Sequence, residues 1–136
     1  MTSPEHELGF DGFTGDAVHA EWLPDSRGLA VLADESVDRH LILLSTRDGG
    51  AARALHRWSS EHLFSGLGVS PDGKYVAFVA PAGGYFQLFR IPLGGGSPAQ
   101  LTFDPSNKTQ PAYAPDGRRI ALTVWEYSVQ FWKLGR

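Results

Sequence analysis

The stretch Val69–Pro81, which reads VSPDGKYVAFVAP, decides the fold, because two close copies of it occur elsewhere in the chain. The copies read EWLPDSRGLAVLAD and AYAPDGRRIALTV, and their prolines stand 47 residues before and 44 residues after Pro71. In every copy the proline is followed by an aspartate, then by a basic residue at the third position and an alanine at the sixth. A period of this length indicates an array of similar supersecondary units.

The repeated Pro-Asp-Gly sequence predicts a tight turn. Proline fixes φ for the first turn position, aspartate tolerates the second, and glycine adopts the left-handed conformation that closes the turn. The first copy has Ser26 where the others have glycine, so we expect its turn to be of another type. Because the aspartates recur in every unit, we predict that they cap turns and are not acid catalysts. The predicted structural turn residues are Pro24, Asp25, Pro71, Asp72, Gly73, Pro115, Asp116 and Gly117.

Each turn leads into a short apolar run, LAVLA, YVAFVA or IALTV, which is too short for a helix and apolar on both faces. Such runs are typical of strands that are buried on both sides. Each is followed by a second strand-like run, HLILLST, QLFRIPL or QFWKLGR, of which the last two align with Phe89 opposite Trp132. In the first two units a glycine-rich turn and a further short strand come next. A four-stranded unit of 40 to 50 residues is a propeller blade, so we predict blades at about 18–55, 65–102 and 111–136.

The pattern W/Y-x-P-D-G-[KR]-x-[IV]-A-[FL], followed by L-[FY]-x-[IVL] and a glycine-rich turn ending in QLT, resembles the PD40 (WD40-like) repeat. The best match is YFQLFRIPLGGGSPAQLTFDPSNKTQPAYAPDGRRIALT. The resemblance covers essentially the whole chain. It implies an all-β fold like the six-bladed propeller of TolB-like proteins and the propellers of prolyl-oligopeptidase and tricorn-type peptidases. It is specific for the fold and almost silent on function.

Three blades are too few to close a ring, because propellers have four to eight. The third unit ends after its third strand, whereas PEHEL at residues 4–8 resembles AARAL at residues 51–55. We therefore predict a homodimer that forms one six-bladed ring, in which residues 4–8 of each chain complete the last blade of the other. The alternative is that the chain is a fragment of a larger propeller.

Composition argues against several classes of partner and site. The net charge is -3 with both signs mixed, which does not favour nucleic acid or an anionic membrane as a partner. The chain has no cysteine, so disulfides and cysteine-ligated metal sites are excluded. It shows neither a secretory signal nor an apolar run of the roughly 20 residues that span a bilayer. We therefore expect a cytoplasmic protein.

No catalytic motif is present in the sequence. Ser70 lies in GVSPD without the G-x-S-x-G frame of a nucleophile elbow, and H-E-x-x-H is missing. The glycines of GLGVSPDG lead into a strand and not into a helix, so they do not form a phosphate-binding loop. We predict a non-enzymatic protein without a cofactor or an assigned metal ligand set.

The predicted function is a rigid scaffold that binds a protein segment or small ligand at the loop face over the central channel. The loops expected to carry it are residues 9–19, 56–66 and 103–110. The candidate binding residues are His19, Glu61, His62, Lys108 and Gln110. Trp22, Trp125 and Trp132 are expected to pack between blades. Trp58, on a predicted loop, is the better interaction candidate of the four, although we expect that it is packed.

Two other functions remain open at this point. The chain could be an accessory or gating propeller of a larger TolB-like or prolyl-oligopeptidase-like protein. It could also be a propeller enzyme whose histidines and glutamates hold a metal at the channel mouth, since imidazole and carboxylate suit zinc and similar ions.

Overall fold

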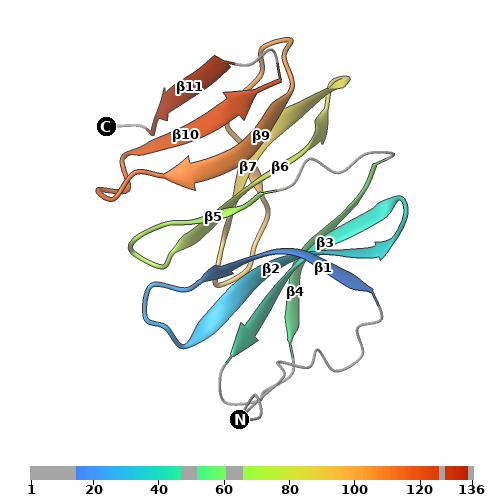
Figure 1. Ribbon diagram of the computed structural model, residues 1–136, viewed down its shortest axis with the longest axis vertical. Helices are drawn as coiled ribbons and strands as arrows, with labels where there is room; N and C mark the ends of the chain where they lie inside the picture. The colour runs from blue at the N-terminus through green and yellow to red at the C-terminus, as the bar shows by residue number, and fades with distance from the viewer. Residues whose placement is uncertain (1–14, 47–51, 61–65, 126–127, 135–136) are drawn as a thin grey trace, which may run out of the picture.

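The computed structural model describes residues 15–46, 52–60, 66–125 and 128–134, and all regular structure in these ranges is β (Figure 1). The strands form three antiparallel sheets, which we call blades 1, 2 and 3 in chain order. Figure 1 shows them stacked one after another, with blade 1 at the bottom and blade 3 at the top. Nothing in the described ranges is a helix that could cross a membrane.

Each blade is a meander in which consecutive strands pair. Blade 1 contains β1 (Asp16–Trp22), β2 (Gly28–Ser36), β3 (Arg39–Thr46) and β4 (Arg53–Ser59). Blade 2 contains β5 (Gly68–Val69), β6 (Tyr75–Ala82), β7 (Tyr85–Pro92) and β8 (Ala99–Gln100). Blade 3 contains β9 (Lys108–Tyr113), β10 (Arg119–Val124) and β11 (Ser128–Lys133). The N-terminal strand expected at residues 4–8 lies outside the described residues.

The Pro-Asp turn has the same conformation in all three blades. Gly73 and Gly117 have φ angles of 72° and 74°, and Ser26 takes the same left-handed conformation with φ of 60°. Each of these residues donates its amide to the carbonyl three residues earlier, at 2.8 to 2.9 Å. The expectation of a different first turn is therefore wrong, because the turn needs this backbone conformation and serine can adopt it at some cost.

The turn aspartates bind the backbone in the same way in every blade. The Oδ1 atoms of Asp25, Asp72 and Asp116 each accept the amide of the residue two positions later, at 2.9 to 3.0 Å. This local bond holds the turn closed and accounts for an aspartate at this position in each unit.

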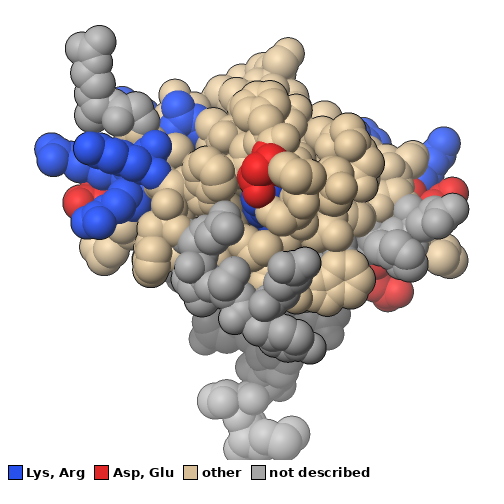
Figure 2. All heavy atoms as spheres, turned by 90° about the horizontal axis from the view of Figure 1, so that it is seen from above, with Lys and Arg blue, Asp and Glu red and all other residues tan. Residues whose placement is uncertain are grey.

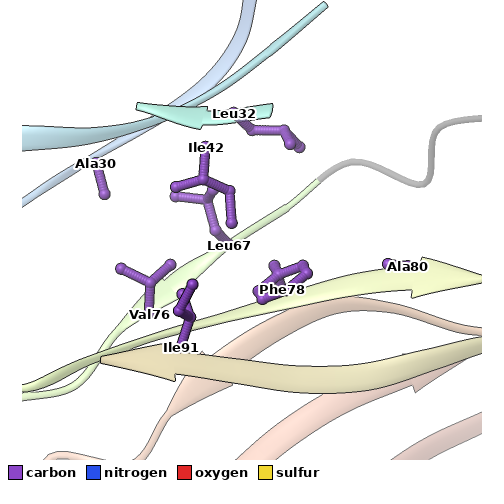
Figure 3. Packing of buried hydrophobic residues seen from close by; sticks show 8 residues of the cluster. All are labelled: Ala30, Leu32, Ile42, Leu67, Val76, Phe78, Ala80 and Ile91. Atoms are coloured by element: carbon purple, nitrogen blue, oxygen red, sulfur yellow. The ribbon is translucent and has the colours of Figure 1, made fainter. Parts of the chain in front are cut away.

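Every blade has two faces, one on the side of the preceding position in the array (the leading face) and one on the side of the following position (the trailing face). On β6, Val76 and Phe78 lie on the leading face and pack against blade 1, whereas Ala77 lies on the trailing face and packs against blade 3. The core between blades 1 and 2 is formed by Ala30, Leu32, Ile42, Leu67, Val76, Phe78, Ala80 and Ile91 (Figure 3). The core between blades 2 and 3 is formed by Ala77, Leu88, Ile120, Leu122 and Val124.

The register of blade 3 differs from the sequence alignment by two residues. Trp132 pairs with Ile120 in the same way that Ile91, and not Phe89, pairs with Val76. A shift by two leaves each side chain on its own face, because side chains alternate with a period of two. Trp132 accordingly packs against the core between blades 2 and 3.

Trp22 and Trp125 depart from expectation, whereas Trp58 is packed as expected but lies on a strand. Within the chain Trp22 and Trp125 are 59% and 61% exposed, so they do not pack between blades of the same chain. Trp58 belongs to β4 and not to a loop, and its ring lies 5.4 Å from that of Phe78 in the neighbouring blade. Trp58 is therefore part of the packing between blades 1 and 2.

Candidate functional site

The first strand of each blade lies at the inner, most crowded side of the arc. Here β5 contacts both β1 and β9. A Cβ atom added to Gly68 would lie 3.0 Å from the carbonyl oxygen of Pro111, and one added to Gly66 would lie 2.8 Å from Cα of Gln110. Glycine is needed at these two positions because two backbones approach this closely. The strands β1, β5 and β9 are therefore the ones that line the channel of a propeller.

Two of the predicted binding residues occupy equivalent positions on these inner strands. Counting back five residues from the turn prolines gives His19 on β1, Gly66 just before β5 and Gln110 on β9. Counting back three residues gives Glu21, Gly68 and Ala112. Side chains at these positions therefore lie at equivalent places along the inner side of the arc. We call His19, Glu21 and Gln110 the inner-strand site.

His19 and Glu21 form a pair on β1. Nε2 of the imidazole lies 2.8 Å from Oε1 of the carboxylate, and the two side chains are 36% and 45% exposed. A β-bulge between Ala17 and His19 precedes the pair. An exposed ion pair contributes little to stability, at most about 1 kcal/mol. Its hydrogen-bonding groups are open to water and so to a ligand.

Gln110 stands at a second bulge, where the pairing of β9 with β10 shifts between Ala121 and Thr123. Its φ angle is 52°, which is in the left-handed region, and its side chain is exposed. A non-glycine residue in this conformation costs roughly 1–2 kcal/mol, and such strain gathers at functional positions. The bulge turns the Gln110 amide away from the regular alternation of the strand.

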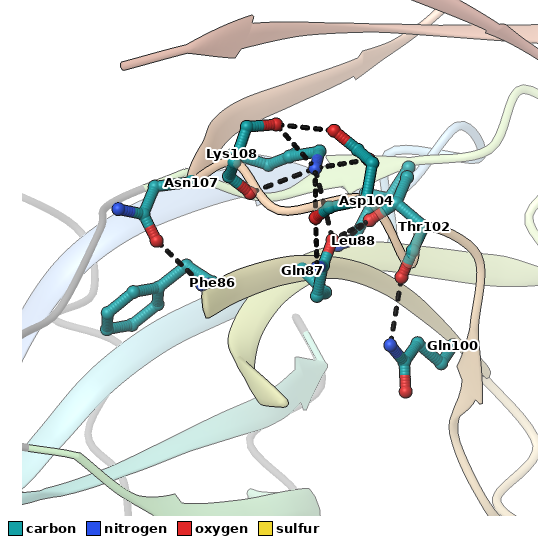
Figure 4. Close-up of polar contacts among 9 residues, drawn as sticks. Phe86, Gln87, Leu88, Gln100, Thr102, Asp104, Asn107 and Lys108 are labelled. Atoms are coloured by element: carbon teal, nitrogen blue, oxygen red, sulfur yellow. Dashed lines mark hydrogen bonds and ion pairs between the residues drawn. The ribbon is translucent and has the colours of Figure 1, made fainter. Parts of the chain in front are cut away.

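Lys108 does not lie on an open loop face, although it was a binding candidate. It begins β9 and is completely buried. Its ammonium donates to Asp104 Oδ1 at 2.5 Å, to the Ser106 carbonyl and hydroxyl at 2.9 and 2.8 Å, and to Gln87 Oε1 at 3.1 Å (Figure 4). These contacts fix the connection between blades 2 and 3 to β7, so Lys108 is occupied in holding the fold together.

The same cluster shifts the acid–base behaviour of Asp104. The hydrogen bond from Lys108 is the largest cause that lowers the pKa of this carboxyl, and the hydroxyl of Ser106 adds to it. Gln87 completes the cluster, because its amide donates to the Asp104 carbonyl at 2.7 Å and its oxygen accepts the Thr102 hydroxyl at 2.6 Å.

The three predicted binding loops are shorter than expected. Residues 16–19 belong to β1, residues 56–59 to β4 and residues 108–110 to β9. β1 and β9 continue through their bulges, whereas strict alternation of side chains in the sequence predicts that each strand ends there. Glu61 and His62 lie outside the described residues. Among the residues that are described, no three His, Asp or Glu side chains are close enough to share a metal ion.

The structure also forms a polar cluster that sequence analysis did not single out. His40 at the start of β3 is 1% exposed, with Nδ1 2.7 Å from Asp34 Oδ1 and Nε2 3.1 Å from the Ser60 carbonyl oxygen. It borders a cavity of about 260 Å³ that is also lined by Glu35, Arg39, Arg57, Trp58 and Ser59. Arg57 and Glu35 pair across it at 3.0 Å.

His40 has a structural counterpart in blade 2. Gln87, also buried at 2% exposure near the start of the third strand, likewise reaches the backbone carbonyl of the loop after the fourth strand. The sequence signal for this role was the alignment of HLILLST with QLFRIPL. In both blades the buried polar side chain ties the third strand to the connection that leads to the next blade, so this role is a structural one.

No family model matches the sequence. Among solved structures, TolB from Acinetobacter baumannii superposes with a TM-score of 0.76, at 21% identity over 90% of this chain and 31% of that chain. The TolB structure from Agrobacterium tumefaciens gives a TM-score of 0.66, at 25% identity over 88% of this chain and 44% of that chain. The chain has a TolB-like β-propeller fold.

Peptidases are also similar to this TolB-like chain. A solved prolyl endopeptidase gives a TM-score of 0.67 at 13% identity, with 90% of this chain and 21% of that chain covered. In sequence, the uncharacterized peptidase YuxL of Bacillus subtilis is 30% identical over 91 residues, which is 66% of this chain and 13% of that protein. The chain thus spans less than half the length of each of these relatives.

Proposed function

We propose that the chain is a non-enzymatic propeller scaffold that binds a protein segment or small ligand at the inner-strand site. The observation that carries the proposal is the strained, exposed Gln110 at the position equivalent to His19, whose imidazole is paired with Glu21. Amide, imidazole and carboxylate together offer both hydrogen-bond donors and acceptors, which suits the backbone of an extended peptide. The crowded inner strands hold these groups on a rigid frame, so little ordering is required on binding.

A peptide-display selection on the purified chain tests this proposal. Selected peptides are expected to bind the wild-type chain and to lose about tenfold or more in affinity to the His19→Ala and Gln110→Gly variants. Gln110→Gly removes the side chain but retains a residue suited to the positive φ angle. Lys74→Ala is the matched control, because Lys74 is exposed beside the Pro-Asp-Gly turn at the other end of the strands.

Two results would contradict the proposal. One is that no peptide is enriched over a chain-free surface. The other is that enriched peptides bind equally well to His19→Ala and Gln110→Gly, which would place binding elsewhere on the propeller.

The likeness to YuxL favours a second candidate, an accessory propeller that belongs to a peptidase-like protein. An immunoblot of the source cell with an antibody against this chain distinguishes the two. A product much larger than 14.8 kDa supports the accessory propeller, and a product of 14.8 kDa supports the independent scaffold.

A further inference from the structure

Contacts between successive blades repeat at positions that can be counted from the turn proline of each blade. In the step from blade 1 to blade 2, the trailing-face residue opposite Ala30 is Leu44, and the leading-face residue two positions before the turn proline is Val69. Both side chains pack against the same core cluster. The pair Leu44 and Val69 therefore marks where the two faces meet near the inner end of the blade.

The step from blade 2 to blade 3 brings the same two positions together. Here the residue opposite Ala77 is Arg90, and the residue two positions before Pro115 is Tyr113. Burial raises the pKa of the Tyr113 hydroxyl, and the charge of the nearby Arg90 opposes that rise. The Arg90 guanidinium also lies 4.2 Å above the centre of the Tyr75 ring. Arg90 and Tyr113 therefore meet in this step as Leu44 and Val69 do in the previous one, although the side chains differ.

Among the described residues, the third pair of positions has no blade to meet. The residue opposite Ala121 on the trailing face of blade 3 is Phe131, which is 70% exposed. The residue two positions before Pro24 on the leading face of blade 1 is Trp22, which is 59% exposed, whereas Val31 and Ala33 on the same face are buried within the chain. Figure 2 looks down on the blade 3 end and shows mainly uncharged atoms over its middle, with one acidic group near the centre and most charged atoms toward the two edges.

The Pro-Asp turns repeat in the same way. A Cβ atom at Gly73 would lie 3.9 Å from Cδ of Pro24, and one at Gly117 would lie 3.7 Å from Cδ of Pro71. The proline of each turn therefore packs beside the left-handed residue of the next turn. Pro115 is the proline left over at one end of the chain, and Ser26 is the left-handed residue left over at the other.

We propose that a second copy of this chain packs against the trailing face of blade 3 and against the exposed inner end of the leading face of blade 1. Phe131 and Pro115 of one copy pack against the partner's Trp22 and the partner's Ser26, and the same contact occurs again across a two-fold axis. Both halves of the contact are present on one chain and follow its repeated frame, which is why a second copy fits. Exposed apolar faces of this kind favour association, and two sets of three blades give a number that propellers can close.

Closure also changes the inner-strand site, a consequence that rests on the proposed function. The step from blade 2 to blade 3 sets Gly66 against Gln110, as the Cβ distance shows. At the contact between the two copies, Gln110 stands against the partner's His19. The two backbones are farther apart there than at Gly66 and Gln110, because Gln110 has a side chain and Gly66 has none. The binding site is then composite, with each copy supplying Gln110 to the partner's histidine–glutamate pair.

Light scattering coupled to size exclusion tests the interface. The wild-type chain is expected to have twice the mass of 14.8 kDa. Phe131→Glu and Trp22→Lys are each expected to weaken the dimer about a hundredfold or more, since both are exposed anchors whose loss leaves the monomer fold intact. Phe103→Glu is the matched control, because Phe103 is 74% exposed in the connection before β9, away from both faces. Far-ultraviolet circular dichroism confirms that each variant folds.

Mixing the two monomeric variants gives the sharpest result. A mixed dimer has one native Phe131–Trp22 contact and one contact between the introduced glutamate and lysine, so mixing is expected to restore the dimer. A monomeric wild-type chain, equal dissociation by Phe103→Glu, or no recovery on mixing would overturn the proposed interface. Peptide binding by a monomeric variant would overturn only the composite site, whereas a dimer that binds no peptide would overturn only the proposed function.

Discussion

Replacing Lys108 by methionine asks whether its buried ammonium stabilises the propeller. Methionine keeps the length and most of the apolar stem of the side chain but removes the charge and its donors. The change removes this donor from five oxygens, those of the Asp104 carboxylate and carbonyl, the Gln87 amide and the Ser106 hydroxyl and carbonyl. Because Lys108 is completely buried, the surrounding side chains have little room to rearrange around the oxygens that have lost their donor.

The cost follows from these contacts. Removing one partner of a buried ion pair costs roughly 3–5 kcal/mol. The Asp104 side chain is 39% exposed, so water can hydrate the carboxylate left behind, and Gln87 Oε1 keeps the hydroxyl of Thr102. We therefore expect Lys108→Met to lower the free energy of unfolding by roughly 2–3 kcal/mol, below the range for a fully buried pair.

Urea unfolding at pH 7 measures this difference, with Lys74→Met as the control. Lys74 is exposed, so its replacement is expected to change the free energy of unfolding by less than about 0.5 kcal/mol. The midpoint should fall for Lys108→Met while the slope with urea stays the same, because the area exposed on unfolding is unchanged.

The pH dependence of the stability difference tests whether Asp104 is the partner of Lys108. The lowered pKa of Asp104 in the folded chain means that its contribution is fully present above its unfolded pKa of about 4 and is lost as the pH falls through the lower folded value. The gap between wild type and Lys108→Met should be constant from about pH 5 to 7 and should narrow below about pH 4. A variant as stable as wild type, or a gap that does not change on acidification, would refute the reasoning.

Three further perturbations test the frame. Ser26→Gly should raise the free energy of unfolding by roughly 1 kcal/mol and Gly73→Ser should lower it by about as much, because both residues have positive φ. Changes of the same sign for the two variants in chemical denaturation would contradict this. Phe78→Ala should cost about 3–5 kcal/mol, since the ring is 1% exposed between blades 1 and 2, and a loss below about 1 kcal/mol in the same assay would mean that the blades do not depend on this core. Asp72→Asn should retain more thermal stability than Asp72→Ala at neutral pH, because it keeps an oxygen that accepts the backbone amide. The stability advantage of the wild type over Asp72→Ala should shrink in acid, since the hydrogen bond from Ser70 lowers the pKa of Asp72. Variants with the same melting temperature at every pH would argue against the turn role.

The sequence was sufficient for the blades because turn chemistry and strand alternation are local. The departures have longer-range causes. Lys108 stands in a polar run that is typical of a loop, and its burial depends on Gln87, which is 21 residues away in the chain. Ser26 could not be read as left-handed from its own identity, because the hydrogen bonds of the turn impose that conformation.

Part of the inner-strand site could be predicted from the sequence. His19 and Gln110 were candidates by their place before the inner strands, and counting back five residues from each proline would have shown that they are equivalent. The positive φ of Gln110 could not be foreseen, because it depends on a bulge that shifts the register by one residue. The pair of His19 with Glu21 was open to prediction, since residues two apart in a strand lie on the same face.

The close approach at Gly66 and Gly68 has a geometrical consequence for the whole arc. Side chains are absent where β5 touches β9, while Leu88, Ile120 and Trp132 fill the space between the same two blades. The interface between blades 2 and 3 is therefore a wedge, and the difference in side-chain volume between its thin and thick ends sets the angle between these blades. Larger residues at the thin end would reduce that angle and raise the number of units in a full turn. The angle between blades 2 and 3 is in this sense determined by the two glycines at the thin end, and a sequence can widen or narrow the arc by altering them without changing the fold of any unit.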